Sequence, residues 1–135
     1  MKYALDTNTI IQLLRENPNV VQRFTTAVDL GDEIVLPPIV HYEMRRGFLS
    51  VSSPKKEMLY NLLIQQYKVG GMTKEVLECG ASIYADLYHK KLTVEDADLL
   101  TAAFCMVGGY TIVTNNTRHF QVINGLVVED WSVAS

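Results

Sequence analysis

Short apolar runs alternate with segments of helical periodicity along this chain, and this alternation restricts the fold more than any other feature. The apolar runs predict strands at residues 2–5, 33–36, 67–69, 110–113 and 126–128. The periodic segments predict helices at 7–15, 20–30, 39–48, 52–66, 73–90 and 93–107. Strands that are continuously apolar and separated by helices are typical of a parallel sheet covered on both faces. The sequence therefore predicts an α/β fold with a mostly parallel central sheet.

Local signals refine the helix boundaries and faces. Asn17-Pro18 is expected to end the first helix and Gly31 the second, because proline cannot continue a helix and glycine favours its end. A capping-box pattern, Thr93-Val94-Glu95-Asp96, predicts the start of the sixth helix and gives Asp96 a capping role. One face of the helix 73–90 is expected to pack inward. Its apolar residues are Val76, Leu77, Ala81, Tyr84, Ala85 and Tyr88.

The composition sets limits on size, compartment and partners. The 135 residues fit a single domain, 1–135, and 48% of them are hydrophobic, which is enough for a core. A net charge of −3 argues against a strongly basic, nonspecific nucleic-acid binder but not against a nuclease, whose catalytic acids lower the net charge. Cys79 and Cys105 read as free thiols, and no signal peptide or membrane span is found, so we expect a cytoplasmic protein.

Three acidic residues lie among apolar residues, where a solvated charge is not expected. Asp6 follows the first strand, Glu43 lies inside the third helix and Asp98 lies early in the sixth. Burying ionised carboxylates is costly unless positive charge compensates them. Carboxylates gathered at one place favour a hard divalent cation such as Mg²⁺. The three acids therefore predict a metal site that acts on a charged substrate.

Each acid also has a structural explanation. Asp6 can cap the helix that follows, although Thr7, Asn8 and Thr9 can do the same, which favours a functional role for Asp6. Glu43 can be a carboxylate placed near a helix start by the helix dipole. Asp98 is two residues after Asp96, roughly 200° round a helix, so the two cannot both face one site. We favour Asp98 as the ligand, with Asp96 in a capping or supporting role.

Polar residues gather where the strands end. Asp6 follows the strand 2–5, and Thr114, Asn115 and Asn116 follow the strand 110–113, so all are expected at one rim of the sheet. Three arginines are candidates for phosphate contact, and ordinary surface exposure is the alternative for each. They are Arg45, Arg46 and Arg118. His119 can be a general base, a metal ligand or a surface residue.

With these residues assembled, the chain resembles PIN-domain proteins and, more narrowly, the VapC-type ribonuclease toxins of bacterial toxin–antitoxin pairs. The resemblance runs nearly end to end and is carried by four segments in order. They are Leu5-Asp6-Thr7-Asn8, Tyr42-Glu43 with Arg46-Gly47, Asp98 to Ala103, and Ile112 to Phe120 with Gly125-Leu126 and Glu129-Asp130-Trp131. By motif, Asp6, Glu43 and Asp98 match the first three acids of that family.

The resemblance implies an α/β/α sandwich and a Mg²⁺-dependent endoribonuclease, in which Mn²⁺ can substitute. It also implies a structured RNA substrate such as tRNA, a cognate antitoxin that inserts a peptide into the active-site groove, and a homodimer. The chain departs from the family at the fourth acid. Its candidate positions hold Asn116 and His119, which affects a second metal more than the first.

Metal-assisted hydrolysis of an RNA phosphodiester is the leading hypothesis. In it, Asp6, Glu43 and Asp98 hold the metal, and a set of neighbouring residues orients water, ligands or phosphate. That set is Thr7, Asn8, Asp96, Thr114, Asn116, His119, Arg45, Arg46 and Arg118. The alternative is a catalytically weak PIN domain that binds RNA or protein. A phosphohydrolase is disfavoured because Asn8 stands where a second aspartate is needed, and a receiver domain because the paired acid near the first strand and the lysine after a late strand are missing.

Overall fold

A five-stranded parallel sheet forms the centre of the molecule. The computed structural model describes residues 1–134. The strands are β1 (Lys2–Leu5), β2 (Glu33–Leu36), β3 (Lys68–Val69), β4 (Thr111–Val113) and β5 (Val128–Glu129), in the order β3-β2-β1-β4-β5. Every pair of neighbouring strands is parallel, which confirms the predicted α/β class.

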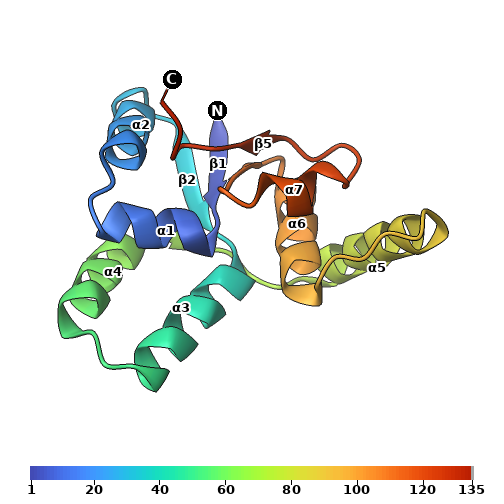
Figure 1. Ribbon diagram of the computed structural model, residues 1–135, viewed down its shortest axis with the longest axis horizontal. Helices are drawn as coiled ribbons and strands as arrows, with labels where there is room; N and C mark the ends of the chain where they lie inside the picture. The colour runs from blue at the N-terminus through green and yellow to red at the C-terminus, as the bar shows by residue number, and fades with distance from the viewer. Residues whose placement is uncertain (135) are drawn as a thin grey trace.

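Helices cover both faces of this sheet, as Figure 1 shows. On one face lie α1 (Thr7–Leu14), α2 (Pro18–Asp29), α3 (Pro38–Ser50) and α4 (Pro54–Gln66). On the other lie α5 (Lys74–His89), α6 (Asp96–Gly108) and the short α7 (Thr117–Gln121). The sequence did not predict α7. None of the helices within residues 1–134 is both long and apolar enough to cross a bilayer.

The inner residues of the central strands are apolar because each strand contributes to both faces of the sheet. Tyr3 and Leu5 of β1 pack in the cluster with α1–α4, whereas Ala4 between them packs in the cluster with α5 and α6. The same alternation places Ile112 of β4 on the α6 side and Val113 on the α1 side. Successive side chains of a strand point to opposite faces, so a sheet covered on both sides needs an unbroken apolar run.

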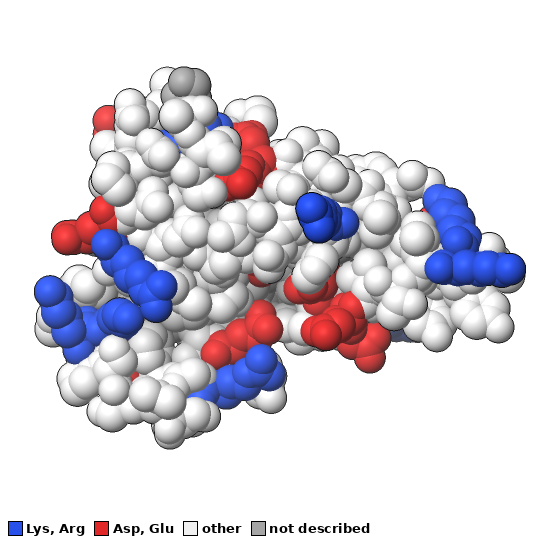
Figure 2. All heavy atoms as spheres, in the orientation of Figure 1, with Lys and Arg blue, Asp and Glu red and all other residues white. Residues whose placement is uncertain are grey.

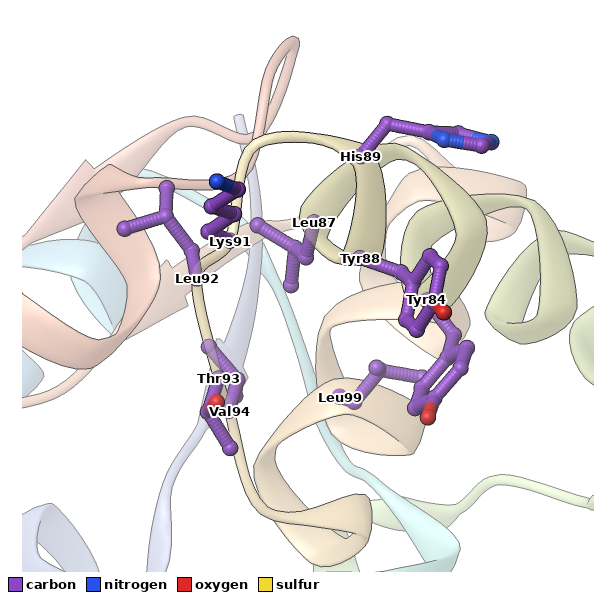
Figure 3. A pocket seen from close by; sticks show the side chains of 9 residues that line it. All are labelled: Tyr84, Leu87, Tyr88, His89, Lys91, Leu92, Thr93, Val94 and Leu99. Carbon is purple, nitrogen blue, oxygen red and sulfur yellow. The ribbon is translucent and has the colours of Figure 1, made fainter.

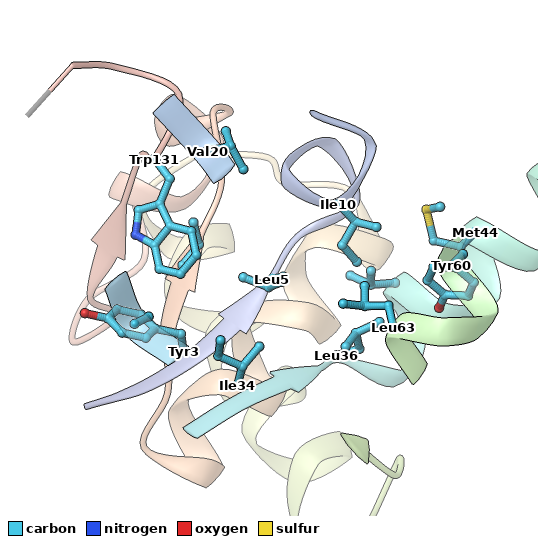
Figure 4. Packing of buried hydrophobic residues seen from close by; sticks show 13 residues of the cluster. Tyr3, Leu5, Ile10, Val20, Ile34, Leu36, Met44, Tyr60, Leu63 and Trp131 are labelled. Carbon is cyan, nitrogen blue, oxygen red and sulfur yellow. The ribbon is translucent and has the colours of Figure 1, made fainter. Parts of the chain in front are cut away.

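Trp131 closes the first cluster near the C-terminus, as Figure 4 shows. Its side chain is buried, its ring meets that of Tyr3 edge-on at 5.1 Å, and its indole N–H donates to Glu129 Oε1 at 3.0 Å. Trp131 thereby anchors the last segment of the chain to the core. In the second cluster, Cys105 is buried and free, and burial raises the pKa of its thiol.

Two predicted helix starts are wrong. The first helix ends before Asn17-Pro18, as predicted, but α2 begins at Pro18 rather than at residue 20, and Asn17 caps it by accepting from the N–H groups of Asn19 and Val20. Proline is tolerated there because the first helical N–H has no partner within the helix. The capping box is also wrong, since α6 begins at Asp96 and its cap residue, Glu95, makes no side-chain hydrogen bond.

The predicted inward face of α5 is the largest error. Val76 is buried as expected, but the other buried positions of α5 are Gly80, Ile83 and Leu87. Leu77, Tyr84 and Tyr88 are more than half exposed, at 51%, 56% and 67%. Both faces of α5 carry apolar residues at helical spacing, so periodicity alone could not select the face that α6 covers.

Candidate active site

The candidate site lies where β1 and β4 end. The sheet register pairs Leu5 with Val113, so the residues that follow them, Asp6 and Thr114, lie side by side. The strand order places β2 on one side of β1 and β4 on the other, which makes this edge the topological switch point of the sheet. Open parallel sheets bind ligands at such a point.

Asp6 is 5% exposed and accepts hydrogen bonds through both carboxylate oxygens. Its Oδ1 accepts from the backbone N–H of Thr7 at 2.9 Å, which caps α1. Its Oδ2 accepts from Thr114 Oγ1 at 2.8 Å and from Asn8 Nδ2 at 3.1 Å. Asp6 therefore caps the helix with one oxygen and contacts Thr114 and Asn8 at the edge of the sheet with the other.

The electrostatic environment of Asp6 disfavours its negative charge. Burial raises the pKa of Asp6 above its usual range, and the hydrogen bonds from Thr114 and the Thr7 N–H offset part of this rise. The negative charges of Asp98 and Glu43 raise the pKa of Asp6 further. The three predicted acids thus act on a common region, where a bound cation would relieve their repulsion.

Glu43 reaches this region from α3. Its Oε1 accepts from Thr7 Oγ1 at 2.8 Å, so Thr7 contacts Asp6 through its backbone and Glu43 through its side chain. Glu43 Oε2 lies 3.6 Å from Arg46 Nη2, and the Arg46 guanidinium lies over the ring of Tyr42 at 5.3 Å. Arg46 therefore stands at the border of the site.

Arg45 is engaged elsewhere. Its guanidinium donates to Asn61 Oδ1 at 2.8 Å, lies 3.5 Å from Glu57 Oε2 and sits over the Tyr60 ring at 5.6 Å. All three partners belong to α4. These contacts hold α3 against α4, which is a structural use of the side chain.

Asp98 enters the site from α6 and is paired with His119 of α7. Asp98 Oδ2 lies 3.1 Å from His119 Nδ1, and their side chains are 25% and 58% exposed. Asp96, in the same first turn, is exposed, whereas Asp98 is partly buried, which agrees with the helical rotation between the two acids. Arg118 lines a cavity of about 250 Å³ together with Asp98 and His119.

The polar rim is completed by asparagine and backbone groups. Asn8 Oδ1 accepts from the Asn115 N–H at 2.9 Å, and Thr114 Oγ1 accepts from the Asn116 N–H at 3.0 Å. The sequence placed Asn116 near the site but did not predict that its backbone makes the contact. It also missed Thr9, which is buried and donates to the Val113 carbonyl at 2.9 Å. The one feature of the sequence that could have pointed to Thr9 is that it is a further threonine in the first turn of α1.

The donor chemistry of the site fits a hard divalent cation. Asp6, Glu43 and Asp98 offer carboxylate oxygens, which Mg²⁺ prefers. Figure 2 shows acidic side chains gathered on the molecular face where α3 and α6 approach each other, with basic side chains to either side. Within residues 1–134, however, no group of three or more His, Cys, Asp or Glu side chains is gathered tightly enough to hold an ion. The charges of Asp98 and Glu43 act on Asp6, but the three carboxylates as placed do not form a single coordination sphere.

Comparison with known proteins gives a consistent relationship over the length of the chain. The family model of the PIN domain matches residues 3–126. Ribonuclease VapC2 of Rickettsia felis is 24% identical over 135 residues, covering 97% of this chain and 98% of the relative. The tRNA(fMet)-specific endonuclease VapC of Shigella flexneri is 29% identical over 140 aligned positions, covering 98% and 99%.

Solved structures agree with this relationship. VapBC2 from Rickettsia felis, bound to a DNA fragment from its promoter, contains a chain that superposes with a TM-score of 0.88 at 21% identity, covering 97% of this chain and 99% of that one. A DNA-bound VapBC from Salmonella typhimurium gives 0.86 at 26% identity, covering 97% and 98%. The fold and the family match together confirm the resemblance seen in the sequence: this chain belongs to the PIN domain family.

Proposed function

We propose that this protein is a VapC-type endoribonuclease that hydrolyses RNA phosphodiester bonds with the help of Mg²⁺, and that it is the toxin of a toxin–antitoxin pair. The observation that carries the proposal is the position of Asp6. It is a buried carboxylate at the switch point of the sheet, and the charges of Asp98 and Glu43 raise its pKa. Relatives that align over nearly the full chain are described as ribonucleases or as tRNA(fMet)-specific endonucleases.

The side chains around the acids have defined roles in this proposal. Thr114 and Asn8 fix the Asp6 carboxylate through its Oδ2, and Thr7 fixes Glu43 through its Oε1. His119 orients Asp98 through the contact at 3.1 Å. Groups that orient acids in this way matter because small displacements of a ligand weaken both binding and catalysis.

Asp6, Glu43 and Asp98 would hold the metal, and Mn²⁺ would substitute for Mg²⁺. When bound, the ion supplies a water of lowered pKa and positive charge beside the phosphoryl oxygens. Arg46 and Arg118, at the borders of the site, would bind the negatively charged RNA backbone.

Cleavage of purified RNA by neutralised variants tests the proposal. The variants Asp6→Asn, Glu43→Gln and Asp98→Asn are compared with the parent in Mg²⁺, in Mn²⁺ and in EDTA. We expect each variant to lose Mg²⁺-dependent cleavage by about 10² or more, as removal of a principal catalytic group does. Asp29→Asn, an exposed carboxylate at the end of α2, is the charge-matched control and reports any contaminating nuclease. Full cleavage by Asp6→Asn or Asp98→Asn contradicts the assignment.

A catalytically weak binding module is the second candidate. It is favoured by the departure from the family at the fourth acid, whose candidate positions hold Asn116 and His119. The same assay separates the two. RNA binding without cleavage in Mg²⁺, Mn²⁺ or Co²⁺ favours the binding module.

A cognate antitoxin and a second copy of the chain are the proposed protein partners. A cavity of about 300 Å³ opens beside Thr7 and Glu43, with apolar walls from α1 and α3 and the basic side chains of Arg15 and Lys56 at its border. This groove would accept an antitoxin peptide next to the acids. Growth arrest on expression of the chain, relieved by a small protein encoded beside it, tests the antitoxin; sedimentation of the purified chain tests the homodimer.

A further inference from the structure

A second hollow lies along the C-terminal end of α5. It has a volume of about 530 Å³ and lies between the end of α5, the loop that follows and the first turns of α6 (Figure 3). The residues that matter here are Tyr84, Tyr88, Lys91 and Leu99. None of them has a role in the site described above, and the sequence patterns predicted Tyr84 and Tyr88 to be core residues.

Two tyrosines give this hollow an aromatic wall. Tyr84 and Tyr88 are one helical turn apart, their ring centroids are 6.3 Å apart and their planes differ by 23°. They remain 56% and 67% exposed, while Leu87 and Leu99 beside them are buried and form an apolar floor. Exposed aromatic faces above an apolar floor can stack with nucleic-acid bases, and such stacking tolerates any base.

The hollow is also lined by a basic side chain, that of Lys91. Within residues 1–134, Lys91 forms no ion pair, whereas its neighbour Lys90 is paired with Asp86 at 2.9 Å. Lys91 is held in the left-handed region with φ of 59°, so the chain turns sharply there. Arg118, which lines the cavity beside Asp98 and His119, also forms no ion pair among the described residues. Both side chains are available for phosphate.

The hollow and the candidate site border on the same loop. The smaller cavity beside Asp98 and His119 shares three lining residues with the hollow, Leu92, Thr93 and Val94. A strand that leaves Asp98 therefore passes Arg118 and His119, crosses the loop and reaches Lys91 and the two tyrosines. Two basic side chains, Arg118 and Lys91, and the aromatic wall thus lie on this path.

We propose that the hollow between α5 and α6 binds an unpaired nucleotide of the RNA substrate, whose base stacks on Tyr84 and Tyr88 while its phosphate contacts Lys91. This subsite rests on the proposed function only in assigning RNA as the substrate. It would select RNA with an unpaired base at a fixed distance from the scissile phosphate. Duplex RNA, whose bases are already stacked, would not use it.

A second copy of the chain is the rival occupant. Leu77, Ala81, Tyr84 and Tyr88 are spaced four, three and four residues apart, which is the spacing of a seam between packed helices. Leu77 belongs to that seam but does not line the hollow. It therefore separates the two explanations: RNA stacking needs Tyr84 and Tyr88 alone, whereas helix pairing needs Leu77 as well.

The test measures the affinity of a short fluorescein-labelled single-stranded RNA by fluorescence anisotropy in EDTA, so that no cleavage intervenes. We expect Tyr88→Ala to raise Kd about tenfold, from the loss of one base stack. Tyr88→Trp keeps an aromatic face and is expected to bind like the parent, as is the matched control Leu77→Ala. Lys91→Ala is expected to weaken binding and lower the salt dependence by about one counterion. All these residues are exposed, and circular dichroism confirms that each variant is folded.

Several outcomes overturn the subsite. One is a parental Kd for Tyr88→Ala. Another is an equal loss of affinity for Leu77→Ala and Tyr88→Ala together with dissociation in analytical ultracentrifugation, which assigns the face to a second copy. Failure of the proposed function gives a different result: Tyr88-dependent RNA binding persists, but Mg²⁺ produces no cleavage. Cleavage that is normal and independent of Tyr84 and Tyr88 leaves the proposed function standing and removes the subsite.

Discussion

The hydroxyl of Thr114 donates a hydrogen bond to Asp6 Oδ2 at 2.8 Å, although the two residues are 108 positions apart in the chain. The hydroxyl oxygen of Thr114 in turn accepts from Asn8 Nδ2 at 3.1 Å and from the Asn116 N–H at 3.0 Å. One fully buried side chain therefore uses its donor and both lone pairs to join the ends of β1 and β4 to the start of α7.

Replacing this hydroxyl is expected to loosen the site. In Thr114→Val the shape is kept, but three hydrogen bonds are lost in a buried place, so the free energy of unfolding should fall by about 1–3 kcal/mol. Thr9→Val is the matched control, because Thr9 is also buried but donates to the Val113 carbonyl. Urea denaturation should show a loss for both variants, and only Thr114→Val should also weaken Mg²⁺ binding by calorimetry. Unchanged Mg²⁺ affinity in Thr114→Val contradicts the role given to Thr114.

The raised pKa of Asp6 predicts a definite pH dependence in the metal-free protein. The folded chain holds the Asp6 proton more tightly than the unfolded chain, whose pKa is the ordinary 3.8. This contribution to stability is therefore complete below 3.8 and is lost as the pH rises through the folded-state pKa. In Asp6→Asn the group no longer titrates. The unfolding free energy of the variant minus that of the parent should become more positive as the pH rises across this interval; a flat difference would show that the pKa is not raised.

The sheet and most of its helices were predictable because local patterns determine them. The strands 2–5 and 33–36 were predicted with the bounds that the structure has. Each is a short, mostly apolar run between turns or helix starts, and such a run has few structural alternatives to a buried strand. The rim was predictable for a similar reason: in a parallel sheet, residues that follow neighbouring strands meet at one edge. Asp6 and Thr114 are in hydrogen-bond contact there.

The remaining features depend on contacts that no local pattern encodes. Which face of α5 is buried depends on where α6 packs. Both faces of α5 carry enough apolar residues to form such a contact, so the sequence does not distinguish them. The pairing of Asp98 with His119 depends on α7, a helix of five residues that gives no periodic signal. Adjacent residues of a helix point about 100° apart, so only one of Arg45 and Arg46 can pack against α4. The position of α4 decides that Arg45 does so and that Arg46 lies beside Glu43 instead.

Placing an acid at position 119 is expected to change metal binding and stability in opposite directions. In His119→Glu a second carboxylate would face Asp98, which His119 Nδ1 now approaches at 3.1 Å. Without metal, the like charges should lower the melting temperature; with Mg²⁺, the additional ligand should tighten binding by about tenfold, as conserved supporting groups of metal sites do. His89→Glu, on an exposed histidine at the end of α5, is the control. Calorimetry in Mg²⁺ and thermal melts in EDTA give both values.

A tighter Mg²⁺ affinity in both histidine variants would indicate a general charge effect rather than a local one. An unchanged affinity in His119→Glu would place residue 119 outside the metal site. Both results would remove His119 from the roles proposed above.

The end of α6 makes a prediction about stability alone. Gly109 ends this helix with φ of 71°, in the left-handed region, and a side-chain carbon built there would meet nothing within 4 Å. The cost of Gly109→Ala is therefore conformational and should be about 1–2 kcal/mol in unfolding free energy. Gly71→Ala is the control, because that position also has open space but no positive φ. Equal effects of the two substitutions would contradict the assigned conformation.

Arg45 and Arg46 are adjacent in the sequence but should give separable effects. Arg45→Ala removes the contacts to Asn61, Glu57 and Tyr60 and should lower the unfolding free energy by about 1 kcal/mol while leaving RNA affinity unchanged. Arg46 is 59% exposed beside Glu43, so Arg46→Ala should cost little stability. It should instead weaken RNA binding and reduce the salt dependence by about one counterion, because one phosphate contact is lost.

The measurement is a salt titration of RNA affinity for both variants, next to urea denaturation of each. The two arginines serve as controls for each other, since each substitution removes the same side chain from the same helix. If Arg45→Ala reduces RNA affinity as much as Arg46→Ala does, the RNA path includes the surface between α3 and α4. If neither does, RNA approaches Asp98 from the side of α6 and α7, where Arg118 would be the arginine that it meets.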